Sequence, residues 1–597
     1  MKEEINNRLS ALREVMRREN LAAFIFPSTD PHHGEYVPDH WKGREWISGF
    51  NGSAGTAVVT MNSAALWTDS RYFLAAEEQL KDTEFQLMKL KMPDTPTIPK
   101  WLGRELLSMS STEIGIDGMV NSLSSVEELI KDMRQNGGIT VRTNLDPLDH
   151  IWENRPPIPE DKVEIQPIEY AGESAMSKIQ RVRKALREQH ADGMLISTLD
   201  DIAWILNLRG SDVHCTPLFV SYLLISTTKV TLFINPKKLT PEVSAYLREN
   251  QVDVEDYDQV KKGLQDYFEY NILIDPDELN YTLSKAIKTK EIIRGKSPVP
   301  AMKAIKNERE IAGFRQAMLK DGIALVKFLK WLKPAVEAGG QTEISIDQKL
   351  TALRAEQPLF RGLSFDTIAG YEQHGAIVHY EATPETDATL EPKGLLLIDS
   401  GAQYQDGTTD ITRTIALGPL TEEQRHIYTL VLKGHIQLEL CKFPSGASGT
   451  QMDILARMDM WREGLNYLHG TGHGVGQYLN VHEGPHQFRM EWMPAPFVKN
   501  MTVTDEPGIY LANRFGVRHE NLLLIVPYME TEFGEFLQFE SLTLCPFDTA
   551  PIVKEMMKDE EIQWLNTYHQ TVFDKLSPYL QPDEVEWLRE ATKPIAK

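Results

Sequence analysis

The alternation of hydrophobic and polar positions predicts the same helix–strand pair at two places in the first half of the chain. Near the N-terminus, a strand predicted at 22–26 follows a helix whose apolar positions are Ile5, Leu9, Leu12 and Met16. A second pair repeats these helical positions 170 residues later, at Ala175, Ile179, Val182 and Leu186. The repeat predicts two related α/β domains in tandem.

Two proline-containing breaks divide the chain into three parts. They lie at 156–167 and at 295–300, where proline disfavours regular secondary structure. After the second break, the apolar spacing predicts a long helix through 305–323, and strand-like runs follow at 394–398 and 521–526. We therefore predict an α/β (α+β) chain with domains at 1–150, 151–300 and 301–597.

Two aspartates frame a predicted hairpin in the third part. An apolar strand ends at Asp399, and Asp410 opens the next strand; a carboxylate in such a position is costly unless it is paired or bound to a metal. A two-residue turn at Asp406–Gly407 would separate the aspartates by about 13 Å along the strand, at ~3.3 Å per residue. A four-residue loop at 403–406 places them directly opposite, and we predict this loop because only then can both reach one pair of metal ions.

A glycine-rich run follows at 468–476, in which glycine occupies every second position from 470 onward. It contains His469 and His473, and His482 lies nine residues further on. Four glycines in one short run weaken any helix or strand and indicate backbone that packs closely around a site. Three histidines in this setting are more typical of a functional site than of a core.

Two glutamates complete the candidate chemistry. Glu506 precedes a Pro-Gly turn, and Glu520 precedes an apolar strand-like run. With Asp399 and Asp410 they give four carboxylates, to which the histidine run adds an imidazole. This oxygen-rich set suits two ions of Mn²⁺, Co²⁺ or Zn²⁺ better than a structural zinc site.

Two other motifs match known patterns only superficially. Residues 482–486 read His-Glu-Gly-Pro-His, which fits the HExxH pattern of single-zinc proteases. That pattern needs a helix, and an interior proline costs about 3 kcal/mol or more. The glycine pair at 52–55 lacks the lysine of a phosphate-binding loop. We therefore reject the single-zinc interpretation of the first segment and interpret the second segment as a plain turn.

The composition of the chain limits which classes of partner we expect the protein to bind. The formal net charge of the 597 residues is -23, so we expect no nucleic-acid binding, which needs a basic surface. No apolar run approaches the ~20 residues of a membrane-spanning helix, and the N-terminus has no signal-peptide pattern. Three scattered cysteines fit a reducing compartment. We therefore expect a cytoplasmic protein without a membrane partner.

These motifs closely resemble the creatinase/aminopeptidase family with the "pita-bread" fold, and within it the three-domain Xaa-Pro aminopeptidases. The resemblance covers nearly the whole chain. It is carried by segments at 48–56, 67–73, 378–380, 399–401, 409–414, 469–476, 480–485 and 506–508. The tail at 564–569 resembles the C-terminal extension of the large cytosolic members, which places an extension from about residue 550.

The resemblance implies two tandem creatinase-like domains followed by a pita-bread catalytic domain. It implies a dinuclear site, usually manganese, whose five ligands are Asp399, Asp410, His473, Glu506 and Glu520. The histidines matching the family's substrate-binding and catalytic residues are His379, His469 and His482. Hydrolysis of an Xaa-Pro bond by a metal-bridged hydroxide, with Glu506 as general base, and a homodimer are implied likewise. One departure is His519, where many members have an aliphatic residue.

Three other functions remain as alternatives. A prolidase would cleave Xaa-Pro dipeptides with the same ligands, but the tandem N-terminal domains and the C-terminal extension favour an aminopeptidase. Methionine aminopeptidases generally lack both N-terminal domains. Peptide-binding modules of this fold have lost metal ligands, whereas all five positions are filled here.

Overall fold

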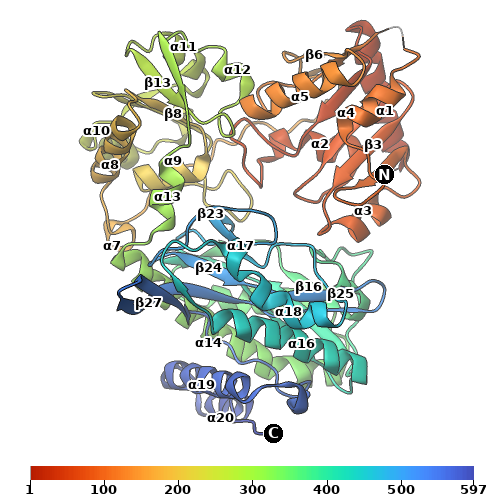
Figure 1. Cartoon of the computed structure of the whole chain (residues 1–597), viewed down its shortest axis with the longest axis vertical. Helices are drawn as coiled ribbons and strands as arrows, with labels where there is room; N and C mark the ends of the chain where they lie inside the picture. The colour runs from red at the N-terminus through yellow and green to blue at the C-terminus, as the bar shows by residue number, and fades with distance from the viewer. Residues whose placement is uncertain (1, 110) are drawn as a thin grey trace. The chain divides into compact units, whose positions relative to one another are not determined.

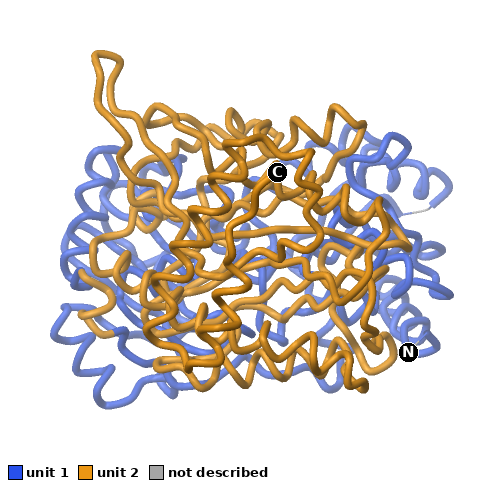
Figure 2. Tube along the Cα trace, turned by 90° about the horizontal axis from the view of Figure 1, so that it is seen from below, with its two compact units in different colours: residues 1–166, 173–299 blue, residues 167–172, 300–597 orange. Residues whose placement is uncertain are grey.

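The computed structural model describes residues 2–109 and 111–597. They form two compact units, each with its own core (Figure 2). Unit 1 comprises 1–166 and 173–299, and unit 2 comprises 167–172 and 300–597.

The first half of unit 1 contains a six-stranded mixed sheet. Its strands stand in the order β4-β3-β2-β1-β5-β6, with α1 (Lys2–Arg18) burying its apolar stripe in the same core. The central strand β1 pairs antiparallel with β2 and parallel with β5. The strands are β1 (Ala23–Phe26), β2 (Thr56–Thr60), β3 (Ala64–Thr68), β4 (Phe85–Lys89), β5 (Glu113–Gly115) and β6 (Thr140–Arg142).

The second half of unit 1 repeats this arrangement. The order is β12-β11-β10-β8-β13-β14, and β8 again pairs antiparallel with one neighbour and parallel with the other. Helix α8 (Ala175–Glu188) buries the positions that match the stripe of α1. The predicted repeat of two α/β domains is thereby confirmed. The strands are β8 (Met194–Ile196), β10 (Tyr222–Ile225), β11 (Val230–Phe233), β12 (Asp253–Glu255), β13 (Asn271–Ile274) and β14 (Glu291–Arg294).

Unit 2 is built from long helices and small antiparallel sheets (Figure 1). Helix α14 begins at a capping box between Asn307 and Glu310, which satisfies orphan N–H groups of its first turn. The sheets that matter for the site have the orders β16-β17-β20 and β21-β28-β27-β24. Their strands are β16 (Ile368–Tyr371), β17 (Leu395–Ser400), β20 (Ile411–Ala416), β21 (Lys442–Pro444), β24 (Thr502–Asp505), β27 (Asn521–Thr531) and β28 (Gly534–Ser541). The helices are α14 (Glu308–Ala338), α15 (Glu343–Ala355), α16 (Glu422–Glu439), α18 (Ile454–Arg462), α19 (Asp559–Leu576) and α20 (Pro582–Ala591).

The hairpin between the two aspartates differs from the prediction. Tyr404 pairs with Gly407, so the turn has two residues and not four. Within the same register Asp399 lies opposite Thr412, two positions beyond Asp410. The four-residue loop was therefore wrong. Both carboxylates still reach one site, because residues offset by two positions project from the same face of a pleated pair.

Candidate metal centre

Five side chains that the sequence singled out converge in unit 2. Asp399 lies in β17 (Leu395–Ser400), and Asp410 directly precedes β20 (Ile411–Ala416). Ligand atoms of Asp399, Asp410 and Glu520 lie within 4.8 Å of one another, and the same holds for His473, Glu506 and Glu520. Because Glu520 belongs to both groups, the five residues form one continuous cluster.

Close backbone packing brings the histidine and the glutamates together. Strand β24 (Thr502–Asp505) leads directly into Glu506 and pairs with β27 (Asn521–Thr531), which follows Glu520. Strand β22 (Gly472–Gly474) carries His473. A Cβ on Gly472 would lie 1.8 Å from the carbonyl oxygen of Thr504. Only glycine therefore lets β22 approach β24 so closely, which explains part of the glycine run.

Burial raises the pKa of every carboxyl group in the cluster. It raises the pKa of Asp399 and of Asp410 to about 6, although Arg518 opposes the shift at Asp399 and His482 opposes it at Asp410. It raises the pKa of Glu506 to about 7 and that of Glu520 well above its ordinary value, in both cases with a further contribution from Asp410. Four carboxylates in one buried site repel one another and need counter-charge.

Two buried carboxylate oxygen atoms indicate that bound cations would supply the counter-charge. Among the described residues, Asp399 Oδ1 and Glu520 Oε1 are shielded from solvent and have no hydrogen-bond partner. Buried acceptors are normally satisfied, so these atoms are suited to coordinate cations. Four carboxylates and one imidazole balance and coordinate two divalent ions.

We expect the affinity for divalent metal ions to fall as the pH drops from about 7 to 5. Protons compete with metal ions for the carboxylates, and the raised pKa values of Asp399, Asp410 and Glu506 place this competition near pH 6–7. Calorimetric titration of metal-free protein with Mn²⁺ between pH 8 and pH 5 measures it. An affinity that stays constant down to pH 5.5 would contradict the shifted carboxyl groups.

An arginine that the sequence analysis did not single out connects the metal cluster to a histidine. Arg518 donates to Asp399 Oδ2 through Nη2 (2.9 Å) and Nε (3.2 Å), and through Nη1 to the Tyr510 hydroxyl (2.8 Å). The same hydroxyl lies 2.8 Å from Nε2 of His469. Thr412 Oγ1 donates to Glu520 Oε2 (2.8 Å). In the sequence, Arg518, Tyr510 and Thr412 are distinguished only by lying within a few positions of the predicted ligands.

The other two predicted histidines flank the cluster differently. A ring nitrogen of His482 lies within 4.8 Å of ligand atoms of Asp410 and His473, and its ring meets that of His473 edge to face. His379 is half-buried and follows Val378, whose carbonyl oxygen accepts a hydrogen bond from Arg518 (3.3 Å). The structure thus brings His482 into direct contact with the cluster and ties His379 to it through the backbone.

The HExxH segment is not a helix, as expected from its proline, but a strand. Residues Glu483–Phe488 form β23, and Glu483 pairs with the buried Lys306. Nε2 of His486 lies 2.6 Å from the carbonyl oxygen of Thr502. The two histidines of the motif therefore do not share a helix face, and the single-zinc protease interpretation is excluded.

A separate buried cluster of His435, Glu439 and Asp505 also has the composition of a metal site. Nδ1 of His435 lies 3.3 Å from Asp505 Oδ2, while Nε2 lies 3.0 Å from Glu439 Oε1. The imidazole ring therefore lies between the two carboxylates, with one nitrogen directed at each. Each ring nitrogen thus already faces a carboxyl group, so we assign no metal to this cluster.

Comparisons with known families cover almost the whole chain. The Creatinase/Prolidase N-terminal domain matches twice, at 8–147 and 154–310. Metallopeptidase family M24 matches at 312–527, and the C-terminal region of peptidase M24 matches at 535–595. The five residues of the cluster all lie within the M24 match.

Full-length relatives decide the family. Aminopeptidase P1 of Arabidopsis thaliana is 37% identical, and the alignment covers 98% of this chain and 99% of the relative. A probable Xaa-Pro aminopeptidase P of Aspergillus flavus is 38% identical, with 99% and 93% covered. The chain belongs to the aminopeptidase P family of M24 metallopeptidases. The predicted fold class, two creatinase-like domains followed by the catalytic domain, is confirmed with it.

Solved structures agree with this membership in the aminopeptidase P family. The X-prolyl aminopeptidase of Caenorhabditis elegans, described as a cytosolic enzyme with a di-nuclear active site, matches with a TM-score of 0.95 and 35% identity over 99% of this chain and 100% of that one. A Xaa-Pro dipeptidase of Bacillus anthracis matches with a TM-score of 0.51 and 25% identity, over 63% of this chain and 99% of that one. The dipeptidase therefore matches only part of the architecture.

Proposed function

We propose that this protein is a metal-dependent aminopeptidase that releases the N-terminal residue from peptides with proline in the second position. The observation that carries the proposal is the continuous buried cluster of four carboxylates and one imidazole. It lies in a chain that is related over its full length to an X-prolyl aminopeptidase with a di-nuclear active site. We propose two divalent ions, Mn²⁺ first and Co²⁺ or Zn²⁺ as alternatives.

The groups of mutually close ligand atoms suggest how the chain would hold two ions. Asp410, Glu520 and His473 each occur in two of these groups. A carboxylate can bridge two ions through its two oxygens, whereas an imidazole nitrogen has a single lone pair. Asp410 and Glu520 would therefore bridge, with Asp399 at one end of the cluster and His473 and Glu506 at the other.

Bound divalent ions supply an activated water at neutral pH and stabilise negative charge on the scissile carbonyl. Glu506, at one end of the cluster, accepts the proton of the attacking water and delivers it to the leaving proline nitrogen. His482 and His379 orient the carbonyl and stabilise its developing charge. His469, held by Tyr510, shapes the pocket for the proline ring.

Two observations separate this function from the alternatives. Loss of metal ligands would mark a peptide-binding module, but every proposed ligand is present and buried or half-buried. A prolidase would share the cluster, yet the Bacillus anthracis dipeptidase covers only 63% of this chain. The second N-terminal domain and the C-terminal region therefore favour peptides longer than two residues as substrates.

We expect Mn²⁺-dependent release of arginine from Arg-Pro-Pro, with much slower cleavage of the dipeptide Arg-Pro. Arg-Ala-Ala is the matched peptide without proline and should not be cleaved at a comparable rate. Chromatographic quantification of free arginine, before and after chelation, gives the three rates. Preference for Arg-Pro would make the protein a prolidase, and no cleavage with any metal ion would favour a binding module.

The location, the oligomeric state and the partners of the protein can also be proposed. The described part of the chain has no helix long and apolar enough to cross a membrane. We propose a cytoplasmic location, as stated for the Caenorhabditis elegans enzyme, and a homodimer, from the resemblance noted above. Sedimentation of the purified protein tests the dimer. We expect peptides and no nucleic acid as partners.

A further inference from the structure

A buried arginine joins the two chain segments that carry Asp410 and Glu520. Arg413 donates through Nη1 to the carbonyl oxygens of Thr412 (3.0 Å) and Glu520 (2.8 Å). These two residues already form a β-bridge, in which the Glu520 N–H donates to the Thr412 carbonyl oxygen (3.0 Å). Arg413 thus fastens the backbone at the point where the two proposed bridging ligands enter the cluster.

The rest of the arginine is held by residues outside the metal cluster. Its Nη2 donates to Asn521 Oδ1 (2.8 Å), to the Cys545 carbonyl oxygen (2.8 Å) and to the Tyr568 hydroxyl (3.1 Å). The guanidinium group also lies 3.8 Å from the centre of the Phe547 ring. A planar guanidinium with five donors can be fixed from several sides at once, so its orientation depends on these partners.

Tyr568 brings the C-terminal region into this arrangement. It projects from α19, and its hydroxyl donates towards the carbonyl oxygens of Thr543 (2.8 Å) and Cys545 (3.1 Å). On the same helix, Nε2 of His569 accepts the N–H of Phe547 (3.0 Å). The segment that holds Arg413 is therefore itself held by α19.

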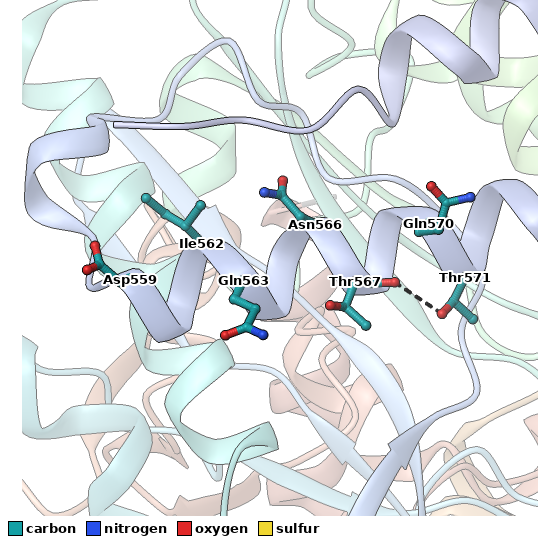
Figure 3. A pocket seen from close by; sticks show the side chains of 7 residues that line it. All are labelled: Asp559, Ile562, Gln563, Asn566, Thr567, Gln570 and Thr571. Atoms are coloured by element: carbon teal, nitrogen blue, oxygen red, sulfur yellow. Dashed lines mark hydrogen bonds between the residues drawn. The ribbon is translucent and has the colours of Figure 1, made fainter.

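The two faces of α19 differ in character. The face towards the core carries Leu565, Tyr568 and Val572, all buried. A different face lines a pocket whose residues are polar except for Ile562, with Asn566 and Thr567 at its middle (Figure 3). On the face towards the core, the Tyr568 hydroxyl is a buried polar group that contacts Arg413 and the backbone of Thr543 and Cys545.

We propose that α19 is a positioning element of the metal centre and that Tyr568, acting through Arg413, fixes the geometry of Glu520 and Asp410. The proposal rests on the function proposed above. Among the described residues, the hydrogen-bond partners of these two side chains include no ligand atom of the cluster; each acts through the backbone and through Asn521. Groups behind the ligands commonly change metal affinity or activity by about 10- to 100-fold when they are altered.

The test replaces Tyr568 by phenylalanine, which keeps the ring in the core and removes only the hydroxyl. Two controls belong with it. Tyr579→Phe removes a hydroxyl from an exposed tyrosine just after α19. Val572→Ala removes apolar contacts from the same buried face without touching a polar group, and so reports on destabilisation of the helix alone.

We expect Tyr568→Phe to weaken Mn²⁺ binding by about tenfold in a chelator-competition titration. For the peptide Arg-Pro-Pro we expect kcat to fall with KM nearly unchanged, because the hydroxyl does not contact substrate. Tyr579→Phe should match the parent protein, and Val572→Ala should lower the thermal midpoint while Mn²⁺ affinity is kept. Equal Mn²⁺ affinity in Tyr568→Phe and the parent would overturn the proposal.

A double-mutant cycle tests the route through Arg413. Arg413→Lys keeps the charge and removes the planar fork. If Tyr568 acts through this arginine, adding Tyr568→Phe to Arg413→Lys should change Mn²⁺ affinity little further, whereas additive effects would contradict the route. The metal titration does not depend on peptide cleavage. If Tyr568→Phe weakens Mn²⁺ binding in a protein that cleaves no peptide, the proposed function is contradicted, whereas this inference is supported.

Discussion

Replacing Asp410 by asparagine is expected to lower kcat/KM for Arg-Pro-Pro by at least about 10³, because metal ions contribute several kcal/mol to such reactions. Asp410 belongs to two of the groups of close ligand atoms, and an amide cannot bridge two ions through two anionic oxygens. The variant should retain fewer than two ions per chain. Metal analysis of the dialysed protein and the peptide assay measure the two effects.

The same change should stabilise the protein when metal ions are absent. Asp410 contributes to the raised pKa of Glu520 and of Glu506. Above about pH 7 all of these groups are ionised in the unfolded chain, while the folded chain is destabilised by their mutual repulsion. Removing one charge should raise the free energy of unfolding by about 1 kcal/mol for each pKa unit relieved. Thermal unfolding at pH 8 with a chelator measures this gain.

Asp574→Asn is the matched control, because Asp574 is an exposed residue of α19. It should change neither activity nor stability appreciably. An Asp410→Asn protein that keeps two ions and normal activity would remove Asp410 from the metal centre. One that unfolds more readily with chelator would contradict the repulsion among the buried carboxylates.

Replacing Glu506 by glutamine is expected to lower kcat by about 10² to 10⁴, the usual contribution of a general base. Glu506 lies at one end of the cluster, where a carboxylate can accept a proton from water and return it to the leaving group. Glutamine keeps the size and one neutral oxygen, so KM should change far less than kcat. Steady-state kinetics at saturating Mn²⁺ separate the two parameters.

Retention of both ions must be shown for Glu506→Gln, since this residue is also a proposed ligand. Glu532→Gln, at the exposed turn between β27 and β28 (Gly534–Ser541), is the matched control and should leave kcat unchanged. If Glu506→Gln holds two ions and keeps its kcat within a factor of about two, the general base is another group.

The convergence of the five candidate side chains in unit 2 could be anticipated from the sequence because their local signals, weak one by one, agreed with one another. Asp399 ends an apolar strand, and His473 lies in a glycine run whose close packing is visible at Gly472. The hairpin register could not be predicted in the same way. Turn length depends on how β18 (Ala402–Tyr404) and β19 (Gly407–Thr408) pair with each other, and requiring the aspartates to be directly opposite gave the wrong loop.

Residues that act behind the cluster left no signal of their own. Arg518 and Arg413 are separated from Asp399 and Tyr568 by 119 and 155 positions, and no spacing rule connects such pairs. The ring of His519 packs edge to face against Tyr428. Tertiary packing alone decides which buried polar groups meet.

The central claim is tested most directly by counting metal ions and cleavage events in the same samples. Metal-free protein is titrated with Mn²⁺, and each sample is analysed for bound metal and for release of arginine from Arg-Pro-Pro. We predict that cleavage is absent without metal and reaches its full rate at two ions per chain. Full cleavage in protein holding less than one ion, or two bound ions without any cleavage, would contradict a dinuclear Xaa-Pro aminopeptidase.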